Sequence, residues 1–321
     1  MDASLKLDRR RVVDFISENG FYVIFLLWVL FLALQTDTFM TWDNASKVVR
    51  QAAIIGIVAI GESLIVMLGT MDVSVASTLG LTAIIVAAGI VDFSLPPALA
   101  VLIAIGAGGL IGLVNGLLVT LIGINPIIAT LGMMTILDGL GLTYTGGHTI
   151  YGDAIDPIEF LYTGWIGPVP VPVLLLFVFY LVAHFVLSYT TFGAYIYATG
   201  SNDKATWLSG IKTARIRLYA FVIAGLLAGF GGVMAAARRG SAGAGMGGNF
   251  LFPILTAVIL GGISLSGGRG RVLNVLAAAI FLMAIDNGLI HLGADINIQR
   301  IVSGAILIVA LSLDRLRVMV R

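Results

Sequence analysis

Long apolar runs separated by short polar segments dominate the chain. Many runs are apolar on every face of a helix, whereas a helix of a soluble protein keeps one polar face. A membrane-spanning helix needs about 20 mostly apolar residues. The runs therefore predict ten spans, of which the third and eighth have the weakest pattern: 20–36, 51–70, 74–91, 97–121, 125–144, 168–187, 216–237, 250–266, 272–291 and 298–314.

Composition and the placement of charge agree with this pattern. Hydrophobic residues make up 59% of the 321 residues and charged residues only 11%, against about 25% charged in soluble domains. With the N-terminus inside, 13 of the 18 basic residues fall on the cytoplasmic side, as the positive-inside rule requires. We predict one all-α domain, 1–321, a polytopic membrane bundle of about ten helices with both termini cytoplasmic. Eight spans remain possible if the two weak segments are re-entrant.

The 40 glycines fall into two groups. Gly108, Gly112 and Gly116, and likewise Gly225 and Gly229, are spaced by four, which is typical of helices whose backbones touch in a membrane. Others crowd into 241–248 and 261–271, which predict loops or broken helix covered by protein or by a water-filled cavity. The segments "LGTMDVS" (68–74) and "LGGISLS" (260–266) also match in outline, as in a duplicated transporter architecture.

Acids and amides inside the predicted spans are candidates for function. A carboxylate at the centre of a span costs on the order of 2.5–3.5 kcal/mol, so each acid should face the bundle interior or a wet cavity. Asp138 and His184 lie near span ends and are expected to be structural. Glu62 either lines a solute path or bonds two helices together. The candidates for lining such a path are Glu62, Asp72, Ser74, Asn115 and Asn287.

Sequence motifs give no support for an enzyme. Cysteine is absent, and the three histidines are not at metal-ligand spacing. The chain also lacks a phosphate-binding P-loop. We therefore predict no catalytic residues, no metal and no cofactor in this chain, and no nucleic-acid partner. Any uphill transport would draw on an ion gradient or on another subunit.

One short polar stretch, "ATGSNDKATWLSGI" (198–211), interrupts the apolar pattern. Ser201 or Asn202 can cap a helix whose first turn holds Asp203, and Gly210 stands where a left-handed cap is expected. These signals predict a helix of about two turns. With Trp207 as an anchor, it either lies in the headgroup region or binds a cytoplasmic partner.

The same stretch carries a resemblance to a known family. "FGAYIYATGSNDKATWLSGI" (192–211) resembles the coupling-loop motif of the ribose/xylose/galactose-type permeases of ATP-binding-cassette importers. "LGTMDVSVAST" (68–78), "IIATLGMMTI" (127–136), "LGGISLSGGRGRV" (260–272) and "DNGLIHLG" (286–293) resemble further motifs of that family, in the same order. The chain departs from the family at "FLFPILTA" (250–257), where two acids are commonly found, and at Asp138, where many members have arginine.

The resemblance implies a permease of the bacterial inner membrane that pairs with a second copy or a paralogue. A periplasmic sugar-binding protein would deliver a sugar or sugar-like solute. A cytoplasmic ATPase with two nucleotide-binding halves would hold the ATP and magnesium. Within the coupling segment 188–215, the contact residues would be Ser201, Asn202, Asp203, Lys204, Ala205, Thr206, Trp207, Leu208, Ser209 and Gly210.

Two points remain open in this interpretation. Arg238 and Arg239, on the predicted outer side, either dock the binding protein or extend to the headgroups. An ion-coupled secondary transporter is the alternative function, in which Glu62, Asp72 or Asp286 would bind a proton or sodium ion.

Overall fold

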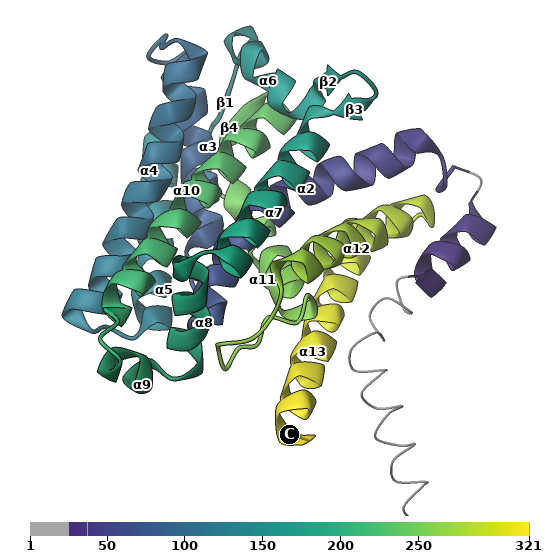
Figure 1. Cartoon of the computed structure of the whole chain (residues 1–321). Coiled ribbons are helices and arrows are strands. Elements are labelled where there is room, and N and C mark those ends of the chain that lie inside the picture. The colour runs from purple at the N-terminus through teal and green to yellow at the C-terminus, as the bar shows by residue number, and fades with distance from the viewer. Residues whose placement is uncertain (1–25, 37, 321) are drawn as a thin grey trace, which may run out of the picture.

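The computed structural model describes residues 26–36 and 38–320 (Figure 1), with the side chains of 310 and 313–320 excepted. The basic residues Lys6 and Arg9 to Arg11, and the beginning of the first predicted span, lie outside the described residues. Every predicted apolar run within this part forms a helix. The longer helices are α2 (Trp42–Met67), α3 (Val75–Val91), α4 (Pro97–Leu117), α5 (Pro126–Thr145), α7 (Val171–Tyr189), α10 (Thr213–Arg239), α12 (Val272–His291) and α13 (Ile296–Val320).

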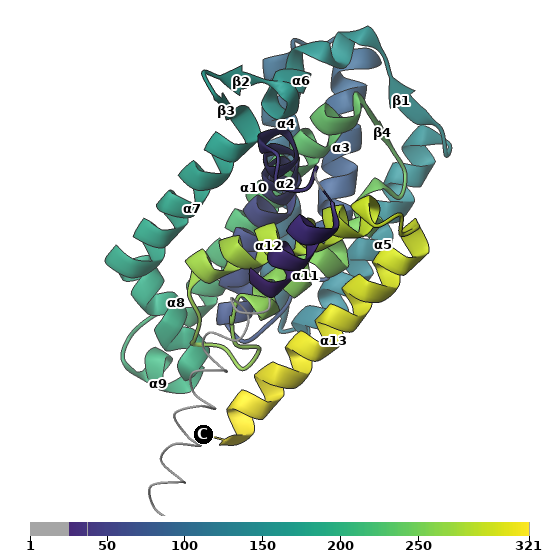
Figure 2. The same ribbon diagram turned by 90° about the vertical axis from the view of Figure 1, so that its right-hand side faces the viewer.

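Short elements lie at the two ends of the bundle. One end carries α6 (Asp156–Thr163) and two antiparallel strand pairs, and the other carries α8 (Thr191–Ser201) and α9 (Asp203–Leu208) (Figures 1 and 2). The strands pair as β1 (Thr149–Tyr151) with β4 (Ser241–Gly243) and β2 (Trp165–Ile166) with β3 (Val169–Pro170). The all-α prediction is therefore correct for the bundle but missed these strands.

Six of the described helices are long and apolar enough to cross a membrane, namely α2, α5, α7, α10, α12 and α4 with its extension to Ile122. Four more are apolar but shorter: Leu26–Gln35, Val75–Val91, Met246–Leu260 and Ile296–Val309. The chain is thus a polytopic helical membrane protein. The predicted number of ten spans and the side on which the termini lie stay predictions.

The centre of the bundle is formed by α2 and α10, with α3 and α4 packed against α10. Figure 2 shows α7 and α13 on opposite sides of the bundle with α12 between them. Tyr180 of α7 is buried and donates its hydroxyl to the carbonyl oxygen of Gly56 in α2, at 3.0 Å. Helices that are buried all round therefore occupy the middle, and helices with one exposed apolar face surround them.

The predicted glycine contacts are confirmed between α4 and α10. A Cβ at Gly108 would overlap the carbonyl oxygen of Gly225, and a Cβ at Gly225 would overlap that of Gly108. One turn along, a Cβ at Gly112 would overlap the carbonyl oxygen of Phe221. The two backbones are therefore in direct contact, which only glycine permits.

The eighth predicted span is wrong in its extent. Instead of reaching residue 266, α11 (Leu251–Leu260) is a helix of ten residues. Gly262 takes a left-handed conformation with φ of 78°, and the Ile263 amide bonds back to the Val258 carbonyl at 3.2 Å, which ends the helix. At 1.5 Å per residue, ten residues span about 15 Å, roughly half of the hydrocarbon core.

Candidate translocation site and coupling face

Four of the predicted path residues converge in one buried cluster, hereafter the acid–amide cluster: Glu62, Asp72, Ser74 and Asn115. They come from the last third of α2, the loop after it, the N-cap of α3 and the end of α4. All four are buried, with relative exposures between 0% and 4%. The structure thus brings together residues from four segments that the sequence alone could not relate.

A continuous chain of hydrogen bonds holds the cluster. The Asp72 amide donates to Glu62 Oε1 at 3.1 Å. Asp72 Oδ1 accepts from the Ser74 amide at 2.8 Å and from the Ser74 hydroxyl at 2.6 Å. Asn115 Nδ2 donates to Ser74 Oγ at 2.8 Å and lies 3.4 Å from Asp72 Oδ2. Each side chain is therefore oriented by at least one neighbour, as a binding site requires.

Two acceptor atoms of the cluster have no partner among the described residues. Glu62 Oε2 and Asn115 Oδ1 are buried without a hydrogen bond. The only ion pairs in the described part of the chain, Lys47–Asp43 and Arg217–Asp203, lie elsewhere. Leaving a buried polar atom unsatisfied costs about 1–3 kcal/mol, and more for a charged group. Glu62 Oε2 and Asn115 Oδ1 can therefore accept hydrogen bonds from additional donors.

Thr130 lies next to the cluster, although it is not among the predicted path residues. This α5 side chain is buried, and its hydroxyl oxygen accepts from the Val73 amide at 3.1 Å. It therefore fastens α5 to the loop that carries Asp72. The sequence does contain an indication of this role. Thr130 belongs to the "IIATLG" segment, which resembles a family motif, and it follows Asn125, the N-cap of α5, by little more than one turn.

The "LGTMDVS" and "LGGISLS" loops have corresponding geometry and touch each other. In the first loop the Ser74 amide bonds to the side chain of Asp72, and in the second the Ser266 amide lies 3.3 Å from the hydroxyl of Ser264. The Gly268 amide donates to the Met67 carbonyl at 2.8 Å. The outline match between the two segments therefore has a counterpart in their local hydrogen bonds.

A glycine junction connects these loops to α8, and it consists of Gly69, Gly200, Gly267 and Gly268. A Cβ at Gly200 would overlap the Met67 carbonyl oxygen and lie 2.5 Å from the Gly268 amide nitrogen. A Cβ at Gly267 would lie 2.9 Å from the Gly69 nitrogen. The three segments therefore meet backbone to backbone, with no side chain between them.

The predicted polar helix is confirmed as α9. Asn202 is its N-cap, with the Ala205 amide donating to Asn202 Oδ1 at 2.9 Å, and Gly210 has the expected left-handed φ of 86°. Asp203 pairs with Arg217 of α10 at 3.3 Å. The cap and the ion pair fix the orientation of α9 at the base of α10.

The face of α9 that points away from the bundle is apolar and exposed. Trp207 is 62% exposed and Leu208 is 68% exposed, whereas Thr206 is buried against the bundle. Of the other predicted contact residues, Asp203 is half-buried, and the rest are exposed: Ser201, Asn202, Lys204, Ala205, Ser209 and Gly210. The tip of α9 therefore exposes two large apolar side chains, Trp207 and Leu208, with polar residues around them.

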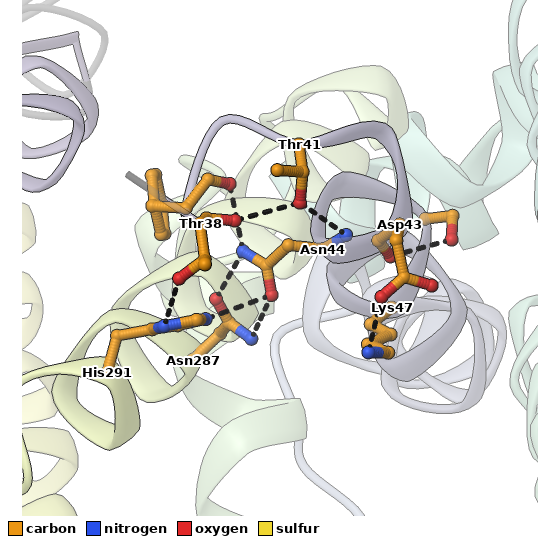
Figure 3. A network of polar contacts seen from close by, with 9 residues as sticks. Thr38, Thr41, Asp43, Asn44, Lys47, Asn287 and His291 are labelled. Atoms are coloured by element: carbon orange, nitrogen blue, oxygen red, sulfur yellow. Dashed lines mark hydrogen bonds and ion pairs between the residues drawn. The ribbon is translucent and has the colours of Figure 1, made fainter. Parts of the chain in front are cut away.

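Asn287 lies apart from the acid–amide cluster, in the network of Figure 3. Asn44 and Asn287 exchange two side-chain hydrogen bonds of 2.9 Å each. His291 Nε2 lies 3.2 Å from Asn44 Oδ1, and His291 Nδ1 lies 3.2 Å from the Thr38 hydroxyl. This network ties the start of α2 to the end of α12. Side-chain hydrogen bonds of this kind hold membrane helices together.

Arg238 and Arg239 are exposed at the end of the bundle that carries α6 and the strands. The Arg238 guanidinium lies 5.7 Å from the centre of the Tyr162 ring, and Arg50 lies 4.5 Å from that of Trp165. Within the described residues, neither Arg238 nor Arg239 has a carboxylate within ion-pair distance. Within the described structure, neither charge is therefore neutralised by an acid.

A multi-pass bundle with a buried polar cluster, joined to an exposed apolar helix at one end, is a membrane transport component rather than a soluble protein. The chain belongs to the family described as the permease component of the branched-chain amino acid transport system, whose model matches residues 44–311.

Three curated proteins that are similar to the chain are named as sugar permeases. The chain is 33% identical to the ribose import permease RbsC of Escherichia coli K12, over 93% of this chain and 94% of the relative. It is 32% identical to the D-allose permease AlsC of that organism, over 92% and 90%. It is 30% identical to the galactose/methyl galactoside permease MglC, over 97% and 98%. No solved structure matches the chain.

Proposed function

We propose that this chain is the membrane-spanning permease subunit of an ATP-binding-cassette importer in a bacterial inner membrane, and that it translocates a sugar or sugar-like solute. The observation that carries the proposal is its similarity, over nearly its whole length, to permeases that are named for ribose, allose and galactose. A separate ATPase would hydrolyse ATP with magnesium, and a periplasmic binding protein would deliver the solute. Both termini would be cytoplasmic.

The exposed tip of α9 supports a role as the contact with the ATPase. A short helix with two apolar anchors fits the helix-in-groove mode of recognition. Closure of the ATPase would move α9, and the glycine junction would pass that movement to the loop 68–74. Because Asp72 lies on this loop, the displacement would reach the acid–amide cluster.

The acid–amide cluster supports recognition of a hydroxyl-rich solute. Sugar hydroxyls are donors, and Glu62 Oε2 and Asn115 Oδ1 are buried acceptors without a partner in the described structure. The cluster is closed in this conformation because all four members are buried. The solute would therefore reach it when the loops around the glycine junction move.

The exposed face of α5 supports pairing with a second permease. Asp138 is exposed in the second half of the membrane-spanning helix α5, together with Ile136 and Leu142. An acid facing lipid is costly, so we infer that this face of α5 lies against a second copy, a paralogue or the solute path.

A mild-detergent pull-down of the tagged chain from its native membrane tests the function. We expect to recover an ATPase with two nucleotide-binding halves, with or without a second permease. Recovery of this chain alone, under conditions that preserve other transporter complexes, combined with uptake driven by protons or sodium, would instead establish the ion-coupled alternative.

Substitution Glu62→Gln tests the acid–amide cluster. Glutamine has nearly the same size and keeps an oxygen that can accept from the Asp72 amide, so folding should be preserved, but it replaces the carboxyl group by an amide. We expect uptake of the solute to fall at least tenfold, a loss of about 1.4 kcal/mol in the transport step. The measurement is radiolabelled uptake at matched membrane levels of protein.

Ser63→Ala is the matched control for Glu62→Gln. Ser63 is equally buried, but among the described residues its hydroxyl bonds only the Ala59 carbonyl, in its own helix. We expect near-normal uptake from this variant. Full uptake by the Glu62→Gln variant would leave Glu62 with a packing role alone.

Charge reversal of Arg238 and Arg239 to Glu tests docking of the binding protein. We expect the affinity for the binding protein to fall about tenfold at low salt. The difference should shrink as ionic strength rises, because exposed charges are screened beyond about 10 Å at 0.1 M salt. Surface plasmon resonance on the reconstituted permease measures this, with Arg300→Glu as a control. Docking that is normal and independent of salt would rule out the role.

A further inference from the structure

A cavity of about 670 Å³ opens beside the coupling segment, between the end of α7, the start of α8 and the beginning of α12. Its lining has two kinds of surface. Four of its polar residues, hereafter the polar wall, are His184, Ser188, Tyr197 and Arg271, and its apolar residues include Leu187 and Leu273. The cavity therefore suits a ligand that is polar at one end and apolar at the other.

The polar wall is positively charged. Its lining contains no aspartate or glutamate, and Arg271 makes no ion pair within the described residues. The Tyr197 hydroxyl donates to the Gly270 carbonyl at 3.0 Å, next to Arg271. Burial raises the pKa of Tyr197 above its usual value, and the charge of Arg271 opposes this rise. The cavity is therefore lined by the neutral phenol of Tyr197 and by the guanidinium of Arg271, which has no ion-pair partner among the described residues.

The polar wall contains two further side chains that can take part in hydrogen bonds, Ser188 and His184. The Ser188 hydroxyl and His184 Nδ1 lie 3.2 Å apart on adjacent turns of α7. Neither group carries a negative charge, so nothing on this wall neutralises Arg271. An anion with several oxygen atoms would satisfy the guanidinium and, in the tautomer in which His184 Nδ1 donates to Ser188, the Ser188 hydroxyl as well.

The cavity lies at the ends of two membrane-spanning helices, where a membrane surface is expected. It lies where α7 ends at Tyr189 and α12 begins at Val272. Leu181 and Phe185, one to two turns earlier on α7, are exposed apolar residues at 69% and 59%. The cavity therefore lies at the end of a membrane-spanning helix whose exposed face is apolar.

We propose that this cavity binds an anionic phospholipid of the cytoplasmic leaflet, with the phosphate at Arg271 and the upper acyl chain along the exposed Leu273. The choice of leaflet rests on the orientation given under the proposed function. Basic pockets between membrane helices on the cytoplasmic side are suited to acidic headgroups, because charge attraction and chain burial act together. The ligand is a resident lipid, chemically distinct from the transported solute.

Lipid titration of the full-length chain, purified in mild detergent and followed by native mass spectrometry, tests the proposal. We expect phosphatidylglycerol to bind at least fivefold more tightly than phosphatidylcholine. Arg271→Gln should weaken phosphatidylglycerol about fivefold, the equivalent of about 1 kcal/mol for one basic residue. Arg269→Gln is the matched control, since Arg269 is exposed on the same loop but does not line the cavity.

A second variant, Ala194→Phe, fills the cavity without changing its charge. Ala194 lines the cavity and is exposed on α8, so the protein should fold normally while phosphatidylglycerol binding falls at least fivefold. Equal binding of the two lipids, or equal losses in Arg271→Gln and Arg269→Gln, would overturn the proposal. Displacement of the lipid by millimolar glycerol 3-phosphate would overturn it too, by assigning the site to soluble phosphates. The assay contains neither ATPase nor solute, so its failure leaves the pull-down result unaffected.

Discussion

Truncation of the α9 tip, Trp207→Ala with Leu208→Ala, is expected to lower solute uptake at least tenfold while the protein still inserts and folds. Both side chains are more than 60% exposed, so the bundle loses little packing when they are removed. A partner that buries them loses two large apolar anchors, of the kind that each contribute about 2 kcal/mol or more to an interface. The ATPase would then hydrolyse ATP without driving uptake.

The measurement is the ratio of solute imported to ATP hydrolysed, in liposomes that contain the permease and its ATPase. A matched control is Leu181→Ala with Phe177→Ala, which removes exposed apolar side chains of 69% and 53% from the lipid-facing side of α7. This control should keep the normal ratio. Tightly coupled transport in the α9 variant would contradict the role of α9 as the coupling helix.

Substitution Gly112→Val is expected to destabilise the folded bundle by about 3 kcal/mol or more, and to lower its thermal midpoint by about 10 °C. Valine would drive its Cβ into the Phe221 carbonyl, and the α10 backbone cannot move aside without opening the contact at Gly108 and Gly225. Because Asn115 follows on the next turn of α4, the acid–amide cluster should be disturbed as well. Thermal unfolding in detergent measures the first effect.

Gly106→Val on the same helix is the control for Gly112→Val. A Cβ at Gly106 meets nothing within 4 Å, and the change in helix propensity is the same at both positions. This variant should stay within about 1 kcal/mol of the natural protein. Equal losses from the two substitutions would show that helix propensity, and not the α4–α10 contact, sets the effect.

The candidate site was partly predictable from the sequence. Glu62 and Asn115 stand out because polar residues are rare inside apolar spans, and Asp72 with Ser74 stands out through the resembling motif. Their convergence was not predictable, because it depends on how α2, α3 and α4 pack. Asn287 satisfies the same polar-in-span criterion and yet lies in a different network with Asn44 and His291.

The sequence by itself determined the features that depend on near neighbours. Apolar length set the helices, the Asn202 cap and Gly210 set the ends of α9, and glycines spaced by four set a helix contact face. Each of these features follows from groups within one or two turns, so the local sequence is sufficient.

Only the tertiary structure decided which distant segments meet. It joined β1 to β4 and placed Gly200 against the backbones of Met67 and Gly268, next to the two similar loops. It also selected four polar residues for one cluster and placed a fifth elsewhere. The physical reason is that such contacts are fixed by the close packing of helices far apart in sequence, for which periodicity and capping carry no information.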